Sequence, residues 1–199
     1  MNKSYRLIGL TGPTGAGKSS VSKFFEESGF AVVNADEIAH KALLDADCIK
    51  DLTEAFSEDI LSPDKSINRK ALAKAAFKDK ESTETLNAIT HPVIIRLSDA
   101  EFKKLAEAGF KDIIFDAPTL FEAGMDSICD LIISVTAPLE IRKKRIIERD
   151  ALTDSQANQR ISAQKDNSFY AEKSDYVIEN NSTPEALKAR TEEVIKELI

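Results

Sequence analysis

The sequence LTGPTGAGKSSV, residues 10–21, places three glycines ahead of a lysine and a serine. From Gly12 to Ser19 it matches the pattern G-x-x-x-x-G-K-[ST] in full. Apolar residues precede it at positions 7–10, and residues 21–27 can form a helix. A strand, a glycine-rich loop and a helix in this order predict a loop whose backbone N–H groups bind the phosphates of a nucleoside triphosphate. The alternative is a glycine-rich turn without a ligand.

The side chains at the end of this loop predict what the nucleotide site contains. We expect Lys18 to reach the β- and γ-phosphates of ATP, and the Ser19 hydroxyl to bind Mg²⁺. The residues expected to contact ATP are Gly12, Pro13, Thr14, Gly15, Ala16, Gly17, Lys18, Ser19 and Ser20.

The composition indicates one folded domain that binds small molecules. The chain has 199 residues, of which 42% are hydrophobic, enough for a sizeable core. Its net charge of −7 argues against broad binding to nucleic acid or to an anionic membrane, but not against a phosphorylated substrate. No apolar run has the ~18 residues of a membrane span, and the first residues lack a signal peptide, so a cytoplasmic protein is expected. Cys48 and Cys129 are expected to be reduced thiols without a metal.

Strand-like and helix-like segments alternate along the chain. Short apolar runs predict strands at residues 5–10, 30–34, 113–115, 131–135 and 176–178. Helical patterns fill residues 36–108, interrupted by a polar loop at 57–68, and a last helix is expected at 184–198. This alternation predicts a parallel sheet covered by helices on both faces, in one domain that carries a helical insertion.

Two carboxylates follow predicted strands, at the sheet edge where ligands bind in such folds. Asp36 could accept a proton from an attacking hydroxyl or help to hold a metal, or it could be the N-cap of a helix that begins at Glu37. Asp116 could hold Mg²⁺, or it could be a residue of the turn that ends its strand.

Several cationic residues could contact phosphate. Arg142, Arg145 and Arg149 fall near one face of a predicted helix, which could close over the transferred phosphoryl group or be a solvated basic face. His91 precedes a proline, which favours a position outside the helix, as a ligand contact or as a helix-boundary residue. His40, in the middle of a predicted helix, is expected to be structural or exposed.

Motifs along nearly the whole chain resemble those of the dephospho-CoA kinase family. The segments GLTGPTGAGKSSV, NADEIAH, INRKAL, LNAITHP, DAPTLFE, RKKRIIERD, QRISAQ and DYVIEN occur in the family's order and spacing. The chain departs from the family at Asn34, Thr119 and three loop positions, and it lacks the usual glycine after Asn180. These departures leave the residues that the chemistry requires in place, but they make the adenine contact less certain.

The resemblance implies a fold and a reaction. The fold is a three-layer α/β/α P-loop kinase fold of the nucleoside-monophosphate-kinase type, with a five-stranded parallel sheet, a helical substrate-binding insertion at about 57–108 and a lid at about 142–165. The reaction is transfer of the γ-phosphoryl group of ATP to the ribose 3′-hydroxyl of dephospho-CoA. It needs ATP and Mg²⁺, and it is the last step of coenzyme A biosynthesis. A monomer or weak homo-oligomer is expected.

The resemblance also implies roles for individual residues. Asp36 lies beside the acceptor hydroxyl, Lys18, Arg145 and Arg149 stabilise the phosphoryl oxygens, and Asn180 lies near the adenine. The expected substrate-binding residues are Asp36, Arg69, His91, Pro118, Phe121 and Glu122, and the expected metal ligands are Ser19 and Asp116.

Two other functions remain open from the residues. One is a P-loop kinase that uses a different hydroxyl acceptor. The other is a nucleotide-dependent switch that hydrolyses ATP slowly. A guanine-specific switch is disfavoured because the sequence has no N-K-x-D motif.

Overall fold

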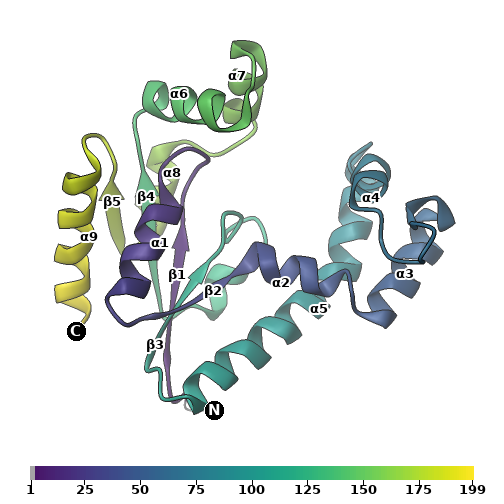
Figure 1. Ribbon diagram of the computed structural model, residues 1–199, viewed down its shortest axis with the longest axis horizontal. Helices are drawn as coiled ribbons and strands as arrows, with labels where there is room; N and C mark the ends of the chain where they lie inside the picture. Colours follow the sequence, from purple (N-terminus) through teal and green to yellow (C-terminus); the bar gives the residue numbers. More distant parts are fainter. Residues whose placement is uncertain (1–2) are drawn as a thin grey trace. The chain divides into compact units, whose positions relative to one another are not determined.

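A five-stranded parallel sheet organises the computed structural model, which describes residues 3–199 (Figure 1). The strand order is β2-β3-β1-β4-β5. The strands are β1 (Arg6–Thr11), β2 (Ala31–Asn34), β3 (Asp112–Asp116), β4 (Leu131–Thr136) and β5 (Tyr176–Glu179). The five predicted strands and the α/β fold class are therefore confirmed, with each boundary displaced by no more than one residue.

The central strand β1 explains why short apolar runs in the sequence predicted the strands correctly. It pairs in parallel with β3, where Ile8 lies opposite Ile114, and with β4, where Leu10 lies opposite Ile133. All four of these side chains are fully buried. A strand buried on both faces needs an almost continuous apolar sequence, which is what residues 7–10 supply.

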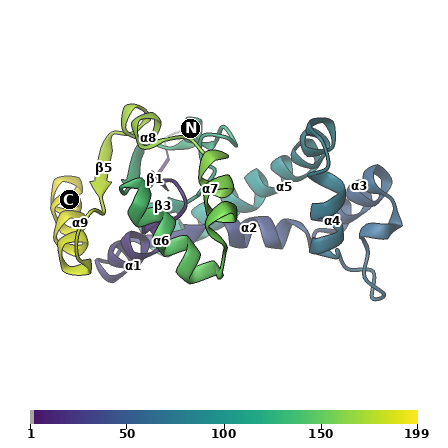
Figure 2. The same ribbon diagram turned by 90° about the horizontal axis from the view of Figure 1, so that it is seen from above.

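The chain divides into two compact units, and the first contains the sheet. This unit ends at Val33 and resumes at Leu105. Its helices are α1 (Lys18–Glu27), α6 (Leu139–Asp150), α7 (Asp154–Ser162), α8 (Asn167–Lys173) and α9 (Pro184–Leu198), with a 3₁₀ turn η2 (Met125–Ile128). Helices α1 and α9 contact each other, and α8 contacts β4 and β5. Figure 2 shows α8 on one side of the sheet and α1 and α9 on the other, so helices cover both faces.

The second unit, Asn34–Lys104, is helical and has its own core. It contains α2 (Ala35–Ala42), α3 (Ala46–Phe56), η1 (Glu58–Ile60), α4 (Arg69–Ala76) and most of α5 (Lys80–Glu107). Its buried core consists of Cys48, Leu52, Ile60, Leu72 and Ala76. The unit begins before the insertion expected at about 57–108. Its role as a substrate-binding insertion stays a prediction.

The expectation that Pro92 places His91 outside a helix is wrong. Helix α5 continues through both residues. Proline inside a helix removes one backbone hydrogen bond and typically costs ~3 kcal/mol. Here Ile89 and Val93, on either side of the proline, pack against the core of the second unit. That tertiary packing offsets the local cost.

The two cysteines are free, as expected, and lie in different units. Burial raises the pKa of the Cys129 thiol to about 12, and burial also raises the pKa of Cys48. Both thiols are therefore poor nucleophiles at neutral pH. Within residues 3–199, no helix combines the length and apolar character that crossing a membrane requires.

We expect Ile114→Ala to lower the free energy of unfolding by about 2–5 kcal/mol, because it leaves a cavity where β3 meets β1. Val177→Ala is the matched control, since Val177 lies on the edge strand β5 and is 38% exposed. Its effect should stay below about 1 kcal/mol. Urea unfolding followed by circular dichroism measures both. Equal losses in the two variants would contradict the assignment of the sheet centre as the core.

Candidate active site

The glycine loop connects the carboxyl end of β1 to the first residue of α1. In parallel α/β sheets this edge is where ligands bind. Gly17 is the N-cap of α1, and no side chain caps the helix. The N–H groups of Lys18 and Ser19, the first two of the helix, therefore have no partner within the helix and lie at its positive end. Such a helix start is suited to bind an anion.

Glycine is required at both ends of this loop because other groups approach its backbone closely. Gly12 has a φ of 146°, and a Cβ there would collide with the carbonyl oxygen of Val135 in β4. Gly17 has a φ of 102°, and a Cβ there would collide with the side-chain amide of Asn180. The loop thus fits tightly between β4 and the residue that follows β5.

The carbonyl groups of the loop are held from outside by Arg145 and Asn180. Arg145 Nη1 donates to the oxygens of Gly15 and Ala16, at 3.3 and 3.4 Å. Asn180 Nδ2 donates to the Ala16 oxygen at 2.7 Å, and its Oδ1 accepts from Arg145 Nη2 at 3.1 Å. The N–H groups of Thr14 and Ala16 are engaged inside the protein, by Gln164 Oε1 and by the Pro13 oxygen. The N–H groups of Gly15, Gly17, Lys18 and Ser19 are therefore the ones that can point to a ligand. Arg145 and Asn180 were predicted to lie near ATP. The structure places both side chains against the glycine loop, which is the loop expected to bind ATP.

Arg142 and Gln164 hold Thr14; Arg142 was one of the three arginines considered for contact with phosphate, and Gln164 was not predicted. Arg142 Nε donates to the Thr14 oxygen at 3.0 Å, and the Thr14 N–H donates to Gln164 Oε1 at 2.9 Å. Arg142 is 3% exposed, and this burial lowers the pKa of its guanidinium below its usual range. The spacing of Arg142 and Arg145, one helical turn apart, was a usable signal for Arg142. The sequence gave no signal for Gln164, because its contact with the Thr14 N–H depends on the tertiary fold.

Arg149 does not join the two other arginines at the loop. Its Nε and Nη2 donate to both carboxylate oxygens of Asp150, at 2.7 and 2.8 Å. Asp150 also accepts from Arg160 at 2.6 Å. The hydrogen bond from Arg149 is the main reason that the pKa of Asp150 lies below its usual value. The predicted role of Arg149 in phosphoryl transfer stays a prediction.

A buried ion pair lies at the end of the loop. Lys18 Nζ, on the first residue of α1, contacts Asp116 Oδ1 at the end of β3. The two side chains are 15% and 5% exposed. The fold thereby brings together the lysine expected to bind phosphate and the carboxylate expected to bind a metal. Asp116 is the last residue of β3 and is buried, and its readings as a metal ligand and as a strand-end turn residue both stay predictions.

The available oxygens fit a magnesium ion that arrives with a nucleotide. Asp116 offers a buried carboxylate, and Ser19 offers an exposed hydroxyl in the first turn of α1. Mg²⁺ prefers oxygen ligands and is commonly bound by one or two protein groups together with phosphates and water. Consistently, no cluster of three or more His, Cys, Asp or Glu side chains in residues 3–199 could hold a metal by itself.

Asp36 is not a helix cap. The N-cap of α2 is Asn34, whose Oδ1 accepts from the N–H of Asp36 at 2.9 Å and of Glu37 at 3.3 Å. The interpretation of Asp36 as the cap is therefore wrong, because the helix begins two residues earlier than the sequence suggested. Asp36 is exposed in the first turn, where its charge also favours the helix N-terminus.

The other predicted substrate-binding residues lie on different elements. Arg69 is the first residue of α4 and is exposed, and His91 is half-buried on α5. Both lie in the second unit. Arg69, together with His40, lines a pocket of about 280 Å³ in that unit, and His91 is not among the lining residues of that pocket.

The turn after β3 holds the remaining predicted substrate-binding residues. The Pro118 oxygen accepts a hydrogen bond from Thr11 Oγ1 at 3.4 Å. Phe121 meets the ring of Phe169 edge to face, with centroids 5.4 Å apart, and lies 6.1 Å from Tyr170. Phe121 thereby anchors the turn to α8. Glu122 is exposed.

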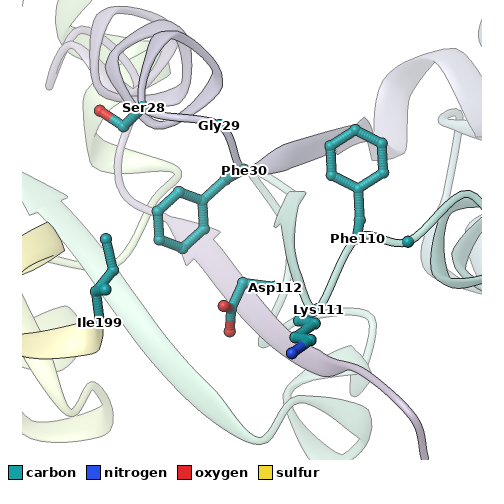
Figure 3. Close-up of a pocket in the computed structure, with 8 residues that line it drawn as sticks. Ser28, Gly29, Phe30, Phe110, Lys111, Asp112 and Ile199 are labelled. Atoms are coloured by element: carbon teal, nitrogen blue, oxygen red, sulfur yellow. The ribbon is translucent and has the colours of Figure 1, made fainter.

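A further pocket, of about 290 Å³, lies at the opposite edge of the sheet. Figure 3 shows Phe30, Asp112 and Ile199 around it, next to the amino ends of β2 and β3. The carboxylate of Asp112 accepts from Arg6 Nε at 2.6 Å, so it is already engaged. This pocket is at the edge away from the glycine loop, and it contributes no group to the candidate site.

Comparisons with known proteins identify a family for the chain. The dephospho-CoA kinase family model matches residues 6–185. A dephospho-CoA kinase from Corynebacterium glutamicum is 37% identical over 96% of both chains. A crystal structure from Thermus thermophilus has a TM-score of 0.84 at 29% identity, covering 99% of this chain and 100% of that one. A dephospho-CoA kinase from Campylobacter jejuni has a TM-score of 0.73 at 28% identity over 96% of both chains. The chain therefore belongs to the dephospho-CoA kinase family.

Proposed function

We propose that this protein transfers the γ-phosphoryl group of ATP to the ribose 3′-hydroxyl of dephospho-CoA, the last step of coenzyme A biosynthesis. The observation that carries the proposal is the buried pair of Lys18 and Asp116 at a glycine loop, in a chain that matches this family over residues 6–185. The acidic net charge does not oppose it, because the positive groups are local.

The glycine loop binds ATP in this proposal. The N–H groups of Gly15, Gly17, Lys18 and Ser19 hold its phosphates, and Lys18 turns from Asp116 to the β- and γ-phosphates. Ser19 and Asp116 hold Mg²⁺, which when bound neutralises charge on the phosphate oxygens. Asn180 lies at the adenine end of the site.

Residues of the second unit act on the acceptor. Asp36 orients the 3′-hydroxyl and accepts its proton, while the hydroxyl oxygen forms a bond to the γ-phosphorus and the bond to the β–γ bridging oxygen breaks. ADP leaves with that bridging oxygen. Because the transition state of phosphoryl transfer is loose, positioning and electrostatics supply most of the rate. Arg69 and His91 bind the substrate.

Residues 142–165 act as a lid over the phosphates. The segment contains α7 and most of α6 and carries Arg145 and Arg149. These guanidinium groups neutralise charge that develops on the phosphoryl oxygens. The lid excludes water, which would otherwise accept the phosphoryl group in place of the 3′-hydroxyl.

The substrate assignment is tested by a coupled assay with ATP, Mg²⁺ and a choice of acceptors. We expect formation of coenzyme A from dephospho-CoA, and at least about tenfold lower kcat/KM with adenosine or a sugar. Phosphorylation of another hydroxyl compound in preference to dephospho-CoA would indicate a different small-molecule kinase. ATP hydrolysis that no acceptor accelerates would indicate a nucleotide switch.

Lys18→Ala should lose most turnover and still fold, with a lower melting temperature because Asp116 loses its buried partner. One electrostatic contact to the transferred group is typically worth ~3 kcal/mol or more in the transition state, so kcat should fall by about 10² or more. Lys23→Ala is the control, because Lys23 lies on the same helix with a side chain that is 70% exposed. Steady-state kinetics measures the turnover of each variant, and a melting curve shows whether each variant is folded. A folded Lys18→Ala within about threefold of the wild type would remove Lys18 from the mechanism.

Asp36→Asn tests the acceptor-side carboxylate. The cap of α2 is Asn34, so the change should hardly alter the melting temperature. It keeps the shape of the side chain and removes its charge and most of its basicity. We expect normal ATP binding and a loss of at least about tenfold in kcat with dephospho-CoA.

Glu37→Gln serves as the control for Asp36→Asn, because Glu37 is the next residue of the same helical turn and is also exposed. Its kinetics should match the wild type. Similar kinetics of both variants and the wild type would exclude Asp36 from the reaction.

A further inference from the structure

The peptide between Thr14 and Gly15 decides where one N–H group of the glycine loop points. A trans peptide is planar, so the Thr14 oxygen and the Gly15 N–H belong to one rigid unit and point in opposite directions. The Gly15 N–H is among the loop groups that can face a ligand. Whatever holds the Thr14 oxygen therefore also aims the Gly15 N–H.

The backbone at Gly15 does not fix this peptide by itself. A Cβ at this position would collide with the Arg142 oxygen, so the close approach of α6 requires glycine. Gly15 has a φ of 78°, and glycine occupies positive and negative φ about equally readily. A rotation about the bonds that flank the peptide would turn the Gly15 N–H away from a ligand. The residue that the fold requires here therefore brings a freedom that other groups must restrict.

Two side chains restrict it by holding Thr14 from both ends. Arg142 Nε donates to the Thr14 oxygen at 3.0 Å, and the Thr14 N–H donates to Gln164 Oε1 at 2.9 Å. With both of its backbone polar groups engaged, Thr14 cannot turn either adjoining peptide without breaking a hydrogen bond. The direction of the Gly15 N–H thus depends on two side chains that lie far along the chain.

The loop has the same arrangement at a second peptide. The Ala16 oxygen accepts from Asn180 Nδ2 at 2.7 Å and from Arg145 Nη1 at 3.4 Å. This oxygen shares its peptide with the Gly17 N–H, which is therefore aimed in the same way. Two of the N–H groups that can face a ligand are directed by side chains that hold the opposite end of their peptide.

The surroundings of Arg142 are unfavourable for a group whose only role is to stabilise the fold. Arg142 is 3% exposed, and its Nη2 is buried without a hydrogen-bond partner among residues 3–199. A buried charged group with an unpaired donor costs free energy. The contact that this guanidinium does make, from Nε to the Thr14 oxygen, is the one that aims the Gly15 N–H.

We propose that Arg142 and Gln164 are positioning residues for ATP, which keep the peptide between Thr14 and Gly15 from turning and so keep the Gly15 N–H directed at the phosphates. Neither side chain touches the nucleotide in this proposal. The inference rests on the proposed function for the identity of the bound triphosphate. Loss of either contact weakens binding of ATP and leaves binding of the acceptor unchanged.

Arg142→Met and Arg142→Lys test the contact to the Thr14 oxygen. The first keeps most of the side-chain length without a donor, whereas the ammonium of the second can still donate to that oxygen. We expect the Kd of ATP with Mg²⁺, measured by calorimetry without an acceptor, to rise at least about tenfold, or ~1.4 kcal/mol, in Arg142→Met. In Arg142→Lys it should stay within about threefold of the wild type. The control is Lys23→Met, which removes an exposed cation from α1 and should leave this Kd unchanged.

Gln164→Leu removes the acceptor of the Thr14 N–H at a half-buried position, so it tests the other contact even if Arg142→Met does not fold. It should raise the Kd of ATP at least about fivefold, and a melting curve shows whether each variant is folded. Steady-state kinetics adds a readout that a purely structural role would not give. The KM of ATP should rise in both variants while the KM of dephospho-CoA stays within about twofold.

The outcomes separate this inference from the proposed function. An unchanged Kd of ATP in folded Arg142→Met and Gln164→Leu overturns the positioning role, while formation of coenzyme A can still prove the kinase. Equal losses in Arg142→Met and Arg142→Lys also overturn it, because the donated hydrogen bond would then not be what matters. Weaker ATP binding as expected, in a wild type that forms no coenzyme A, supports the positioning role and overturns the reaction.

Discussion

The hydrogen bonds from Arg145 and Asn180 to the carbonyl groups of the glycine loop are the constraint on which the candidate ATP site depends. A loop can direct its N–H groups to one side only if its carbonyls are satisfied on the other, because a buried unpaired carbonyl costs ~1–3 kcal/mol. Satisfying them brings α6 and the end of β5 against the loop. That proximity in turn leaves no room for a Cβ at Gly17. The glycine at position 17 and the distant Arg145 are therefore both needed for the same packing of the loop.

The sequence predicted the parts of the structure that depend on local pattern. The five strands and the last helix follow from apolar runs and from turn residues, and the structure confirms them. The glycine loop between a strand and a helix was predicted from its spacing, although α1 begins at Lys18, three residues before the helical segment expected at 21–27. The order of the strands could not be predicted in the same way, because pairing joins segments that are distant in the sequence.

The errors and omissions share a physical cause. Pro92 is tolerated within α5 because neighbouring residues are buried, and Asn34 caps α2 because β2 delivers it there in an extended conformation. Gln164 reaches Thr14 across a large separation in the sequence. In each of these three cases the observed structure depends on tertiary packing or tertiary contacts. The local preferences of single residues do not predict such contacts. The contacts that join separate segments at the candidate site, such as that of Gln164 with Thr14, therefore came from the structure and not from any one motif.

The pair of Lys18 and Asp116 also explains why nucleotide and metal should bind together. A buried ion pair contributes little net stability, but removing one partner leaves a charge in the interior and typically costs ~3–5 kcal/mol. In the proposed mechanism Lys18 leaves Asp116 for the phosphates, so the carboxylate loses its cation. A divalent ion held by Asp116 would replace that cation and offset the negative charge of the phosphates. In this proposal a nucleotide without a metal would leave Asp116 unpaired beside added negative charge, so the two would bind best together.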